Sequence, residues 1–492
     1  MKFREMKKWG VIGFLCLILA GTGFGQNQLG MRLSNYSGVA GMQLNPAHNI
    51  ASRQTWEAQL GGVSLFGDNN YFFVENTSLL DLWRARNLDA SLYERPDLSP
   101  GEVPVGEKVF VVDYQEGSRK RYGTGNLNIM GPGFMIKRDD GQTFGLYTGV
   151  RGGGGSHQVP KGFSYFPYFG QKFYDSFDVE PFAGAIMLWG EVGFNYGFSI
   201  ETNVGRIGLG LNAKILAGME GFYFKSEEQV DFTKLPDLQF TSNIAQLRFG
   251  YTSSNLDPYN LSPKFNGYGL GLDLGFTYIV DGYDEAPKWQ FGASILDIGS
   301  VNFRQNANPQ IVSADSLILI DGGAYDFFTG IEDIPAVVKK FSEQALADSL
   351  LSSAGSQYRI WTPTALTLSA DYSFNDFFFV NAILVQRVPV GDLAVTRDNI
   401  LAITPRFEHK WFEFSLPVVL LEYNQVQVGV AARVGVITIG SDNIASLMGK
   451  SNLSGMDFYF GVKVPGFQAA SERGVPSTSK RRKRGKVKCY SF

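Results

Sequence analysis

Cysteine and histidine are scarce in this chain of 492 residues, which contains two cysteines and three histidines. If an N-terminal signal is removed, Cys489 is the only cysteine left, so no intramolecular disulfide can form. His48, His157 and His409 have no cysteine at a spacing typical of a zinc site. We therefore expect no metal and no cofactor, and we expect the hydrogen-bonded backbone to stabilise the fold.

A long apolar run is also missing. Beyond the first residues, no segment approaches the roughly 20 apolar residues of a membrane-spanning helix. The first residues are typical of an export signal, with a positive start at Lys2 and Arg4, an apolar core over residues 11–20, and small residues at Gly23 and Gly25. We predict a signal peptide over residues 1–25 and therefore an exported protein.

Catalytic motifs are absent as well. Ser156 and His157 are adjacent, and neighbouring positions rarely present a nucleophile and its base to one reacting atom. The glycine run before them, residues 152–155, lacks the lysine and serine or threonine that end a phosphate loop. No Gly-x-Ser-x-Gly elbow occurs. We predict that the protein is not an enzyme, and we expect no nucleic-acid partner for an exported chain.

Alternation of apolar and small residues dominates the rest of the chain. Over residues 266–280, every even position from Tyr268 to Val280 is large and apolar, whereas the odd positions are glycine, aspartate or threonine until Ile279. Successive strand residues point to opposite faces, so one face of this strand is apolar and the other is small or charged. The run exceeds the usual soluble strand of about 5–6 residues and suits a tilted membrane strand of about 9–11.

The pattern recurs along the chain. The other face carries mostly glycine and about one charge per strand, which suits a wall with lipid outside and a crowded polar lumen. Because an unpaired sheet edge is not stable in lipid, the sheet must close. We predict an all-β, closed, antiparallel transmembrane barrel of about 14 strands; the alternative is a soluble sandwich or β-helix with one buried face. The expected strands are residues 56–66, 69–74, 125–137, 143–151, 188–200, 207–217, 266–280, 289–303, 364–374, 377–387, 400–408, 411–421, 426–439 and 456–467.

Seven charged residues fall on the lumen side of this register. Opposed charges there could brace a plug, line a path for solutes, or simply neutralise one another in a narrow interior. Abundant luminal glycine permits close approach of another backbone, which favours a plugged interior over an open pore. The seven residues are Arg151, Glu191, Lys214, Asp273, Asp371, Arg433 and Lys463.

Two further segments stand out. Residues 332–352 have apolar side chains at helical spacing, which predicts one helix in a loop that either packs on that loop or docks a partner. Residues 468–492 form a basic tail that is either solvated or docks on an acidic periplasmic partner. The barrel itself is expected over residues 54–467.

Just after the signal, the motif Asn35-Tyr-Ser-Gly-Val-Ala-Gly-Met-Gln-Leu-Asn-Pro-Ala47 resembles the N-terminal segment of barrels in the long-chain fatty-acid transporter superfamily. With Leu296-Asp-Ile-Gly299, Gly440-Ser-Asp-Asn-Ile444 and the final strand, the chain more closely resembles a Bacteroidota family of outer-membrane barrels of unassigned function. The resemblance implies that residues 26–53 form a hatch or plug and that Asn45, Pro46 and Ala47 lie in the lumen. A simple turn before the first strand is the alternative for these three residues.

The resemblance also implies a function. We expect an outer-membrane protein of a Gram-negative bacterium that contacts membrane lipid and passes hydrophobic small molecules. The alternative is a structural or secretion-associated barrel that binds a periplasmic or cell-surface protein through its loops, helix or tail. A continuous apolar tunnel that ends at a gap in the wall favours the first function, and a sealed lumen with an exposed apolar helix over residues 332–352 favours the second.

Overall fold

The structure is a computed structural model that describes residues 28–85, 91–95, 109–115, 120–161, 172–244, 246–256, 263–281, 287–314, 316–328, 330–449 and 451–466. The expected signal peptide and the basic tail lie outside these residues, as does Phe467 at the end of the last expected strand. Among the described helices, none is both long and apolar enough to cross a bilayer.

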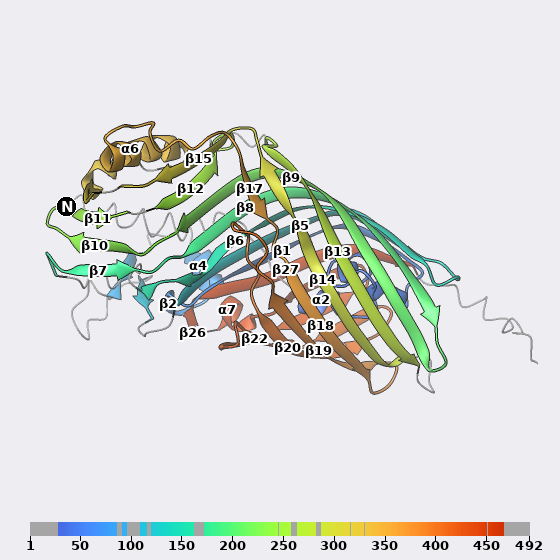
Figure 1. Ribbon diagram of the computed structural model, residues 1–492. Coiled ribbons are helices and arrows are strands. Elements are labelled where there is room, and N and C mark those ends of the chain that lie inside the picture. The colour runs from blue at the N-terminus through green and yellow to red at the C-terminus, as the bar shows by residue number, and fades with distance from the viewer. Residues whose placement is uncertain are drawn as a thin grey trace, which may run out of the picture.

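The predicted closed antiparallel barrel of 14 strands is confirmed (Figure 1). Its first and last strands pair along their ends, from Trp56 opposite Gly466 to Gly61 opposite Val462, and this pairing closes the ring. Three barrel strands are interrupted and consist of two shorter pieces each. In order around the ring, the strands are β1 (Trp56–Asn69), β5 (Arg121–Lys137), β6 (Thr143–Val159), β8 (Ala183–Glu201), β9 (Gly205–Ser226), β13 (Gly267–Asp281), β14 (Pro287–Phe303), β17 (Tyr358–Trp361) with β18 (Ala365–Ser373), β19 (Phe378–Arg387), β20 (Ile400–Glu408), β21 (Phe412–Ser415) with β22 (Val418–Leu421), β23 (Gln425–Val428) with β24 (Val430–Val434), β25 (Ile437–Ser441) and β27 (Gly455–Gly466).

Two members of the expected strand list are wrong, and the errors compensate in the count. Residues 69–74 do not form a wall strand, because β2 (Phe72–Thr77) pairs instead with β4 (Val109–Tyr114) and β26 (Ser451–Leu453) outside the barrel. Residues 426–439 are not one strand, because a two-residue turn at Gly435 and Val436 separates β24 from β25. Gly435 has a φ of 57°, which glycine adopts at little cost. The turn contains no polar residue, so the apolar residues on its two sides read as one run. The outward-facing positions are nevertheless even-numbered in β24 and odd-numbered in β25.

With these corrections, the long connections all lie at one end of the barrel, which also holds the short turn between β22 and β23, and the other described turns lie at the opposite end. The described turns after β5, β8, β18, β20 and β24 are all short, whereas the connections after β1, β6, β9, β14 and β25 are all long. Bacterial outer-membrane barrels show the same asymmetry, with short turns on the periplasmic side. Trp56, Trp289 and Trp411 are exposed at the short-turn end, where aromatic residues form an interfacial girdle in such barrels.

The outer face of the wall is apolar, as the alternation predicts. On β13, Leu270 is 72% exposed and Tyr268 is 61% exposed, whereas Asp273 and Thr277 are fully buried on the inner face. The exception at Ile279 has a structural cause: its side chain is also fully buried, and it packs inside the barrel in a cluster with Ala47 and Ile50. Side chains thus alternate between an exposed apolar surface and a filled interior.

Two small sheets and several helices gather beyond the long-connection end of the barrel (Figure 1). The predicted loop helix is α6 (Ile334–Leu346), shorter than expected because Ala347 ends it in a left-handed conformation. One sheet contains β16 (Ile318–Asp321), β11 (Gln239–Asn243), β10 (Val230–Lys234) and β7 (Ser176–Val179), and the other contains β26 (Ser451–Leu453), β2, β4 (Val109–Tyr114) and β3 (Ser91–Glu94). The remaining elements here are α4 (Leu79–Ala85), β12 (Leu247–Thr252), β15 (Ala307–Val312), η4 (Gly322–Tyr325), η5 (Ile331–Asp333) and α7 (Ile444–Met448).

Two segments occupy the interior. The first, which we call the plug, comprises residues 28–53 and contains α2 (Leu29–Arg32), α3 (Val39–Met42) and η1 (His48–Ile50). The second, which we call the crossing segment, comprises residues 388–399 between β19 and β20. The crossing segment contacts β5, β6, β9 and β14, so it reaches across the interior to the wall half-way around the ring.

Candidate functional site

The plug is the candidate functional element, and the inner wall holds it by hydrogen bonds from many directions. Its residues are buried, apart from three that are half-buried. Wall side chains that bond its backbone come from β1, β5, β8, β9, β14 and β27, and plug side chains bond back to β13 and β20. These contacts are Glu57 with Val39 N (2.9 Å), Lys137 with Ile50 O (2.7 Å), Asn195 with Pro46 O (3.0 Å), Asn212 with Met42 O (2.9 Å), Ser294 with Leu44 O (2.8 Å), Lys463 with Tyr36 O, Asn45 with Phe276 O (2.9 Å) and Asn35 with Glu408 (2.9 Å).

The three predicted hatch residues lie together in the lumen. Asn45 Oδ1 accepts a hydrogen bond from the backbone N–H of Ala47 (3.0 Å), and Asn45 Nδ2 donates to the Phe276 carbonyl of β13. The Asn45 side chain therefore stabilises the turn of the motif and also attaches the motif to the wall. Glycines on the inner wall make room for it: a Cβ at Gly210 would lie 2.3 Å from the Pro46 carbonyl carbon, and one at Gly275 would lie 2.4 Å from Asn45 Oδ1.

Four of the seven predicted luminal charges meet in one buried network, the Asp297 cluster. Asp297 accepts from Arg151 (2.7 and 2.9 Å), from Lys214 (2.7 Å) and from Arg397 of the crossing segment (2.6 Å). Lys214 also lies 2.7 Å from Asp273, and Arg151 lies 3.3 Å from Glu191. Three cations thus face three carboxylates at full burial, which is the pairing that buried charges require.

The other three predicted charges form separate pairs. Asp371 accepts two hydrogen bonds from Arg406 (3.0 and 3.1 Å), and Arg406 also donates to Glu408 (2.9 Å), which binds Asn35 of the plug. Arg433 lies 3.1 Å from Glu413, and Lys463 lies 3.0 Å from Glu57. Every predicted luminal charge is therefore neutralised by an opposite charge.

Arg32 of α2 differs from these paired charges. Its side chain is buried and donates to Gln43 Oε1 (3.1 Å), and its Nε has no hydrogen-bond partner among the described atoms. Burial, together with repulsion from Arg151 and Arg397, lowers the pKa of Arg32 to about 9. The plug thus brings an additional cation against a cluster that is already balanced.

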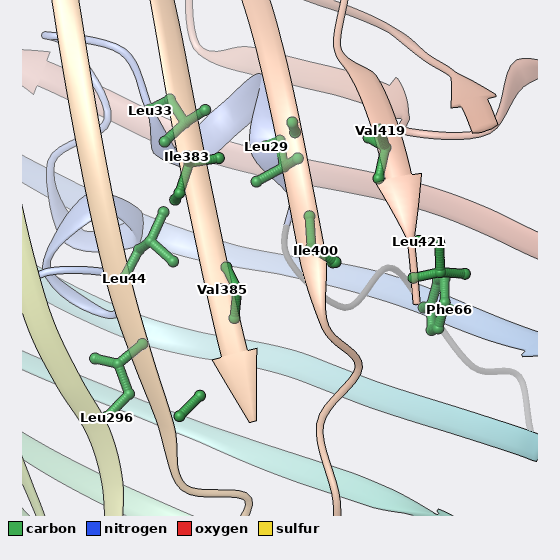
Figure 2. Close-up of a cluster of buried hydrophobic side chains, with 12 residues drawn as sticks. Leu29, Leu33, Leu44, Phe66, Leu296, Ile383, Val385, Ile400, Val419 and Leu421 are labelled. Atoms are coloured by element: carbon green, nitrogen blue, oxygen red, sulfur yellow. The ribbon is translucent and has the colours of Figure 1, made fainter. Parts of the chain in front are cut away.

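Apolar contacts fill the interior on either side of the charges. Leu29, Leu33 and Leu44 of the plug pack against Ile383 and Ile400 of the wall (Figure 2). A second buried cluster joins the crossing segment to the opposite wall and contains Leu393, Val395, Met187, Trp189, Leu216, Tyr223, Val301, Phe303, Tyr358 and Ile360, with Ala185 and Ala307. Between plug and wall, a narrow cavity of about 20 Å³ beside Asn45, His48 and Asp371 holds little more than a water molecule.

The partners of these charges were missed by reading the sequence. Arg406 and Glu408 occupy even positions of β20, as the inward-facing Thr404 does. Extending the alternation through β20 would therefore have predicted that both side chains face the lumen. Asp297 could not be found this way. The pairing of β13 with β14 shifts between Leu272 and Leu274, which forms a bulge, and Asp297 has a φ of 55°. The bulge turns the odd positions of β14 from outward to inward.

These features define a closed β-barrel whose interior is filled by its own N-terminal segment and a crossing segment. The chain belongs to the family of unknown function DUF5723, whose model matches residues 98–442. Membership of a barrel family without an assigned function was expected from the sequence and is confirmed. No curated protein matches the sequence.

Among the solved structures that match this chain are a channel and two transporters, all of low sequence identity. A monoaromatic hydrocarbon channel, the ΔS2S3 mutant of TodX, is 11% identical, with 90% of this chain and 99% of that chain covered and a TM-score of 0.42. The toluene transporter TbuX of Ralstonia pickettii is 12% identical, with coverage of 90% and 98% and a TM-score of 0.40. The toluene transporter TodX of Pseudomonas putida is 11% identical, with coverage of 90% and 96% and a TM-score of 0.36.

Proposed function

We propose that this protein is an outer-membrane barrel of a Gram-negative bacterium that passes hydrophobic small molecules, with the plug as its hatch. The observation that carries the proposal is the apolar inner wall behind the plug. Leu29, Leu33 and Leu44 cover Ile383, Ile400 and their neighbours, so displacement of the plug exposes an apolar surface to the lumen. Pores for polar solutes have polar interiors instead.

The lumen is closed in this structure, which is the feature expected of a partner-binding barrel, so passage of solutes requires movement of the plug. Apart from the peptide chain that continues from the plug into β1, hydrogen bonds and apolar contacts hold the plug against the described wall. Asn45, Pro46 and Ala47 contact β8 and β13 at the centre of the plug, where a small displacement frees the cavity beside Asn45. In this proposal the contacts of these three residues with the wall keep the hatch closed.

A reversible lock tests the hatch. Val39 of α3 and Gly133 of β5 are suitably placed, because a Cβ at Gly133 would lie 2.9 Å from Val39 Cγ1. This separation matches the distance of about 3.0 Å between one sulfur and the opposite Cβ in a disulfide. We expect Val39→Cys/Gly133→Cys, in a Cys489→Ser background, to block uptake of naphthalene by Gram-negative cells when oxidised and to restore it on reduction.

The single-cysteine variants V39C and G133C serve as matched controls and should not respond to oxidant. Uptake that is equal in the oxidised and reduced double variant would reject the hatch. Uptake no faster than in cells lacking the barrel would reject passage of this class of solute.

A second candidate function, docking of a protein partner, has its own observation. Phe327, Leu350 and Leu351, on either side of α6, are 87%, 65% and 65% exposed beyond the barrel end. Large apolar side chains that are exposed to this degree are typical of interaction sites when they form a patch. If the protein binds a partner here, a stoichiometric protein that co-purifies with the wild type should be lost from Leu350→Lys/Leu351→Lys, while uptake is unchanged.

A further inference from the structure

A histidine and two carboxylates converge where the crossing segment meets the wall. His157 lies near the end of β6, Asp398 lies on the crossing segment, and Glu422 lies in the turn after β22. His157 Nε2 is 2.7 Å from Asp398 Oδ1 and 3.5 Å from Glu422 Oε1. One ligand atom from each residue lies within 4.8 Å of the other two. The three side chains are 5%, 1% and 14% exposed, so the group is enclosed.

The surrounding residues orient this group as the outer shell of a metal site does. Thr396 Oγ1 lies 2.8 Å from His157 Nδ1, which directs Nε2 toward the carboxylates. The imidazole stacks on Tyr122, with ring centroids 6.1 Å apart. Thr124 Oγ1 donates to Asp398 Oδ2 (3.1 Å), which leaves Oδ1 directed at the histidine.

Charge also favours a cation here. Asp398 and Glu422 bring two negative charges beside one imidazole. Arg387 lies 3.3 Å from Glu422 Oε1, and the backbone N–H of Asn399 donates to the same oxygen (2.7 Å). A bound cation would add to the positive charge that Arg387 already brings to these two carboxylates.

The separations suit a transition metal. Two ligand atoms each about 2.1 Å from a tetrahedral zinc ion are about 3.4 Å apart, and His157 Nε2 and Glu422 Oε1 are 3.5 Å apart. Asp398 Oδ1, 2.7 Å from the histidine nitrogen, must withdraw by about 0.7 Å to reach the same spacing. One imidazole nitrogen and two carboxylate oxygens form a donor set that suits zinc, manganese or iron(II).

We propose that His157, Asp398 and Glu422 bind one divalent transition-metal ion, which fastens the crossing segment to β6 and to the turn between β22 and β23. β6 and β20 lie on opposite sides of the ring. The ion would therefore hold the crossing segment in place across the lumen, near the long-connection end of the barrel. The site is independent of whether hydrophobic molecules pass through the barrel. Sequence spacing gave no sign of it, because the three ligands are far apart along the chain.

Zinc binding to the purified full-length protein tests the proposal. The protein is prepared in detergent as Cys489→Ser with an affinity tag free of histidine, and metal is removed with a chelator. Titration with Zn²⁺, followed by calorimetry and by elemental analysis, should show one ion per chain. His157→Gln, Asp398→Asn and Glu422→Gln should each weaken binding by at least about 100-fold, because loss of an outer-shell partner alone costs about 10–100-fold.

Two variants serve as matched controls. Asp392→Asn removes a carboxylate from the same crossing segment, where it pairs with Lys225 (2.7 Å) outside the triad. His409→Gln removes a histidine from the turn between β20 and β21. Both should bind Zn²⁺ as the parent does. The temperature at which the parent barrel unfolds should rise with added Zn²⁺, a readout that needs no triad variant to fold. Absence of saturable binding to the parent, or equal binding by parent and all three triad variants, would overturn the site.

Discussion

Glu57 of the first barrel strand and Lys463 of the last lie 3.0 Å apart, from carboxylate Oε2 to ammonium Nζ. Both residues also hold the plug, because Glu57 Oε1 accepts from Val39 N (2.9 Å) and Lys463 donates to the Tyr36 carbonyl. This ion pair across the seam of the ring therefore also helps to retain the plug. Closure of the wall and closure of the lumen are coupled through these two side chains.

Removal of one partner should weaken both closures. Lys463→Met leaves the fully buried Glu57 carboxylate without its cation, and breaking a buried pair in this way costs about 3–5 kcal/mol. Equilibrium unfolding of the purified barrel by guanidinium measures this loss. The double variant Glu57→Gln/Lys463→Met should lose less than the sum of the two single losses, because no uncompensated charge remains. A loss below about 1 kcal/mol for Lys463→Met would contradict the coupling.

Substitution of Arg151, which belongs to the Asp297 cluster, and substitution of Arg32, which lies against the cluster, should have different effects on stability. Arg151→Met removes two hydrogen bonds to Asp297 and the contact to Glu191, so we expect a loss of about 3–5 kcal/mol. Arg32→Met removes a buried cation that Arg151 and Arg397 repel, so we expect unchanged or higher stability. The midpoints of thermal unfolding compare the two variants directly. Equal destabilisation by both substitutions would show that Arg32 also has a compensating partner.

The attachment of the plug should depend on pH through Asp442, in the loop after β25. Asp442 Oδ2 accepts from Leu29 N of the plug (3.0 Å), and burial raises the pKa of this carboxyl to about 6. Because the folded protein binds this proton more tightly than the unfolded chain, stability is highest below pH 4 and decreases as pH rises to about 6, by about 3 kcal/mol.

Asp442→Asn carries no titrating group and should remove this part of the pH dependence. The measurement is the unfolding free energy of both proteins between pH 4 and pH 8. A slope that is the same in the variant and in the parent would assign the pH dependence to other groups.

The wall was predictable because alternation with a period of two is a local property of the sequence. On β13, the exposed Leu270 and the buried Asp273 follow directly from their parity, and the exception at Ile279 marked a contact with the plug. Local alternation also misled where the chain turned without a polar break. At Gly435 and Val436 the chain reverses within an apolar run, so two strands were read as one.

The site was predictable only in part, since its connections depend on three-dimensional proximity. Arg151 and Lys214 were assigned to the lumen by the alternation, but their common partner Asp297 faces inward only because of a bulge in β14. Arg397 reaches the same carboxylate from a segment without regular alternation. The bulge and the path of the crossing segment depend on the packing of distant strands, which a single strand does not encode.

Glycine on the inner wall offers the sharpest test of the hatch geometry. A Cβ at Gly210 of β9 would lie 2.3 Å from the Pro46 carbonyl carbon and 2.4 Å from the Ala47 nitrogen. Both are backbone atoms of the plug, so the Asn-Pro-Ala turn must move away from the wall. We expect Gly210→Ala to cost about 1–3 kcal/mol of stability, as overpacking typically does, and to produce openings in planar-bilayer recordings where the parent stays closed.

Gly123→Ala on β5 is the matched control, since the nearest atom to its Cβ would be Asn69 Cβ at 3.9 Å, an ordinary contact. The same substitution in the same kind of strand should therefore leave both stability and conductance unchanged. If Gly210→Ala were as stable and as closed as Gly123→Ala, the plug would not be seated against β9 as the structure places it. If Gly210→Ala were destabilised but closed, the turn would be a packing element, and the hatch would have to open elsewhere along the plug.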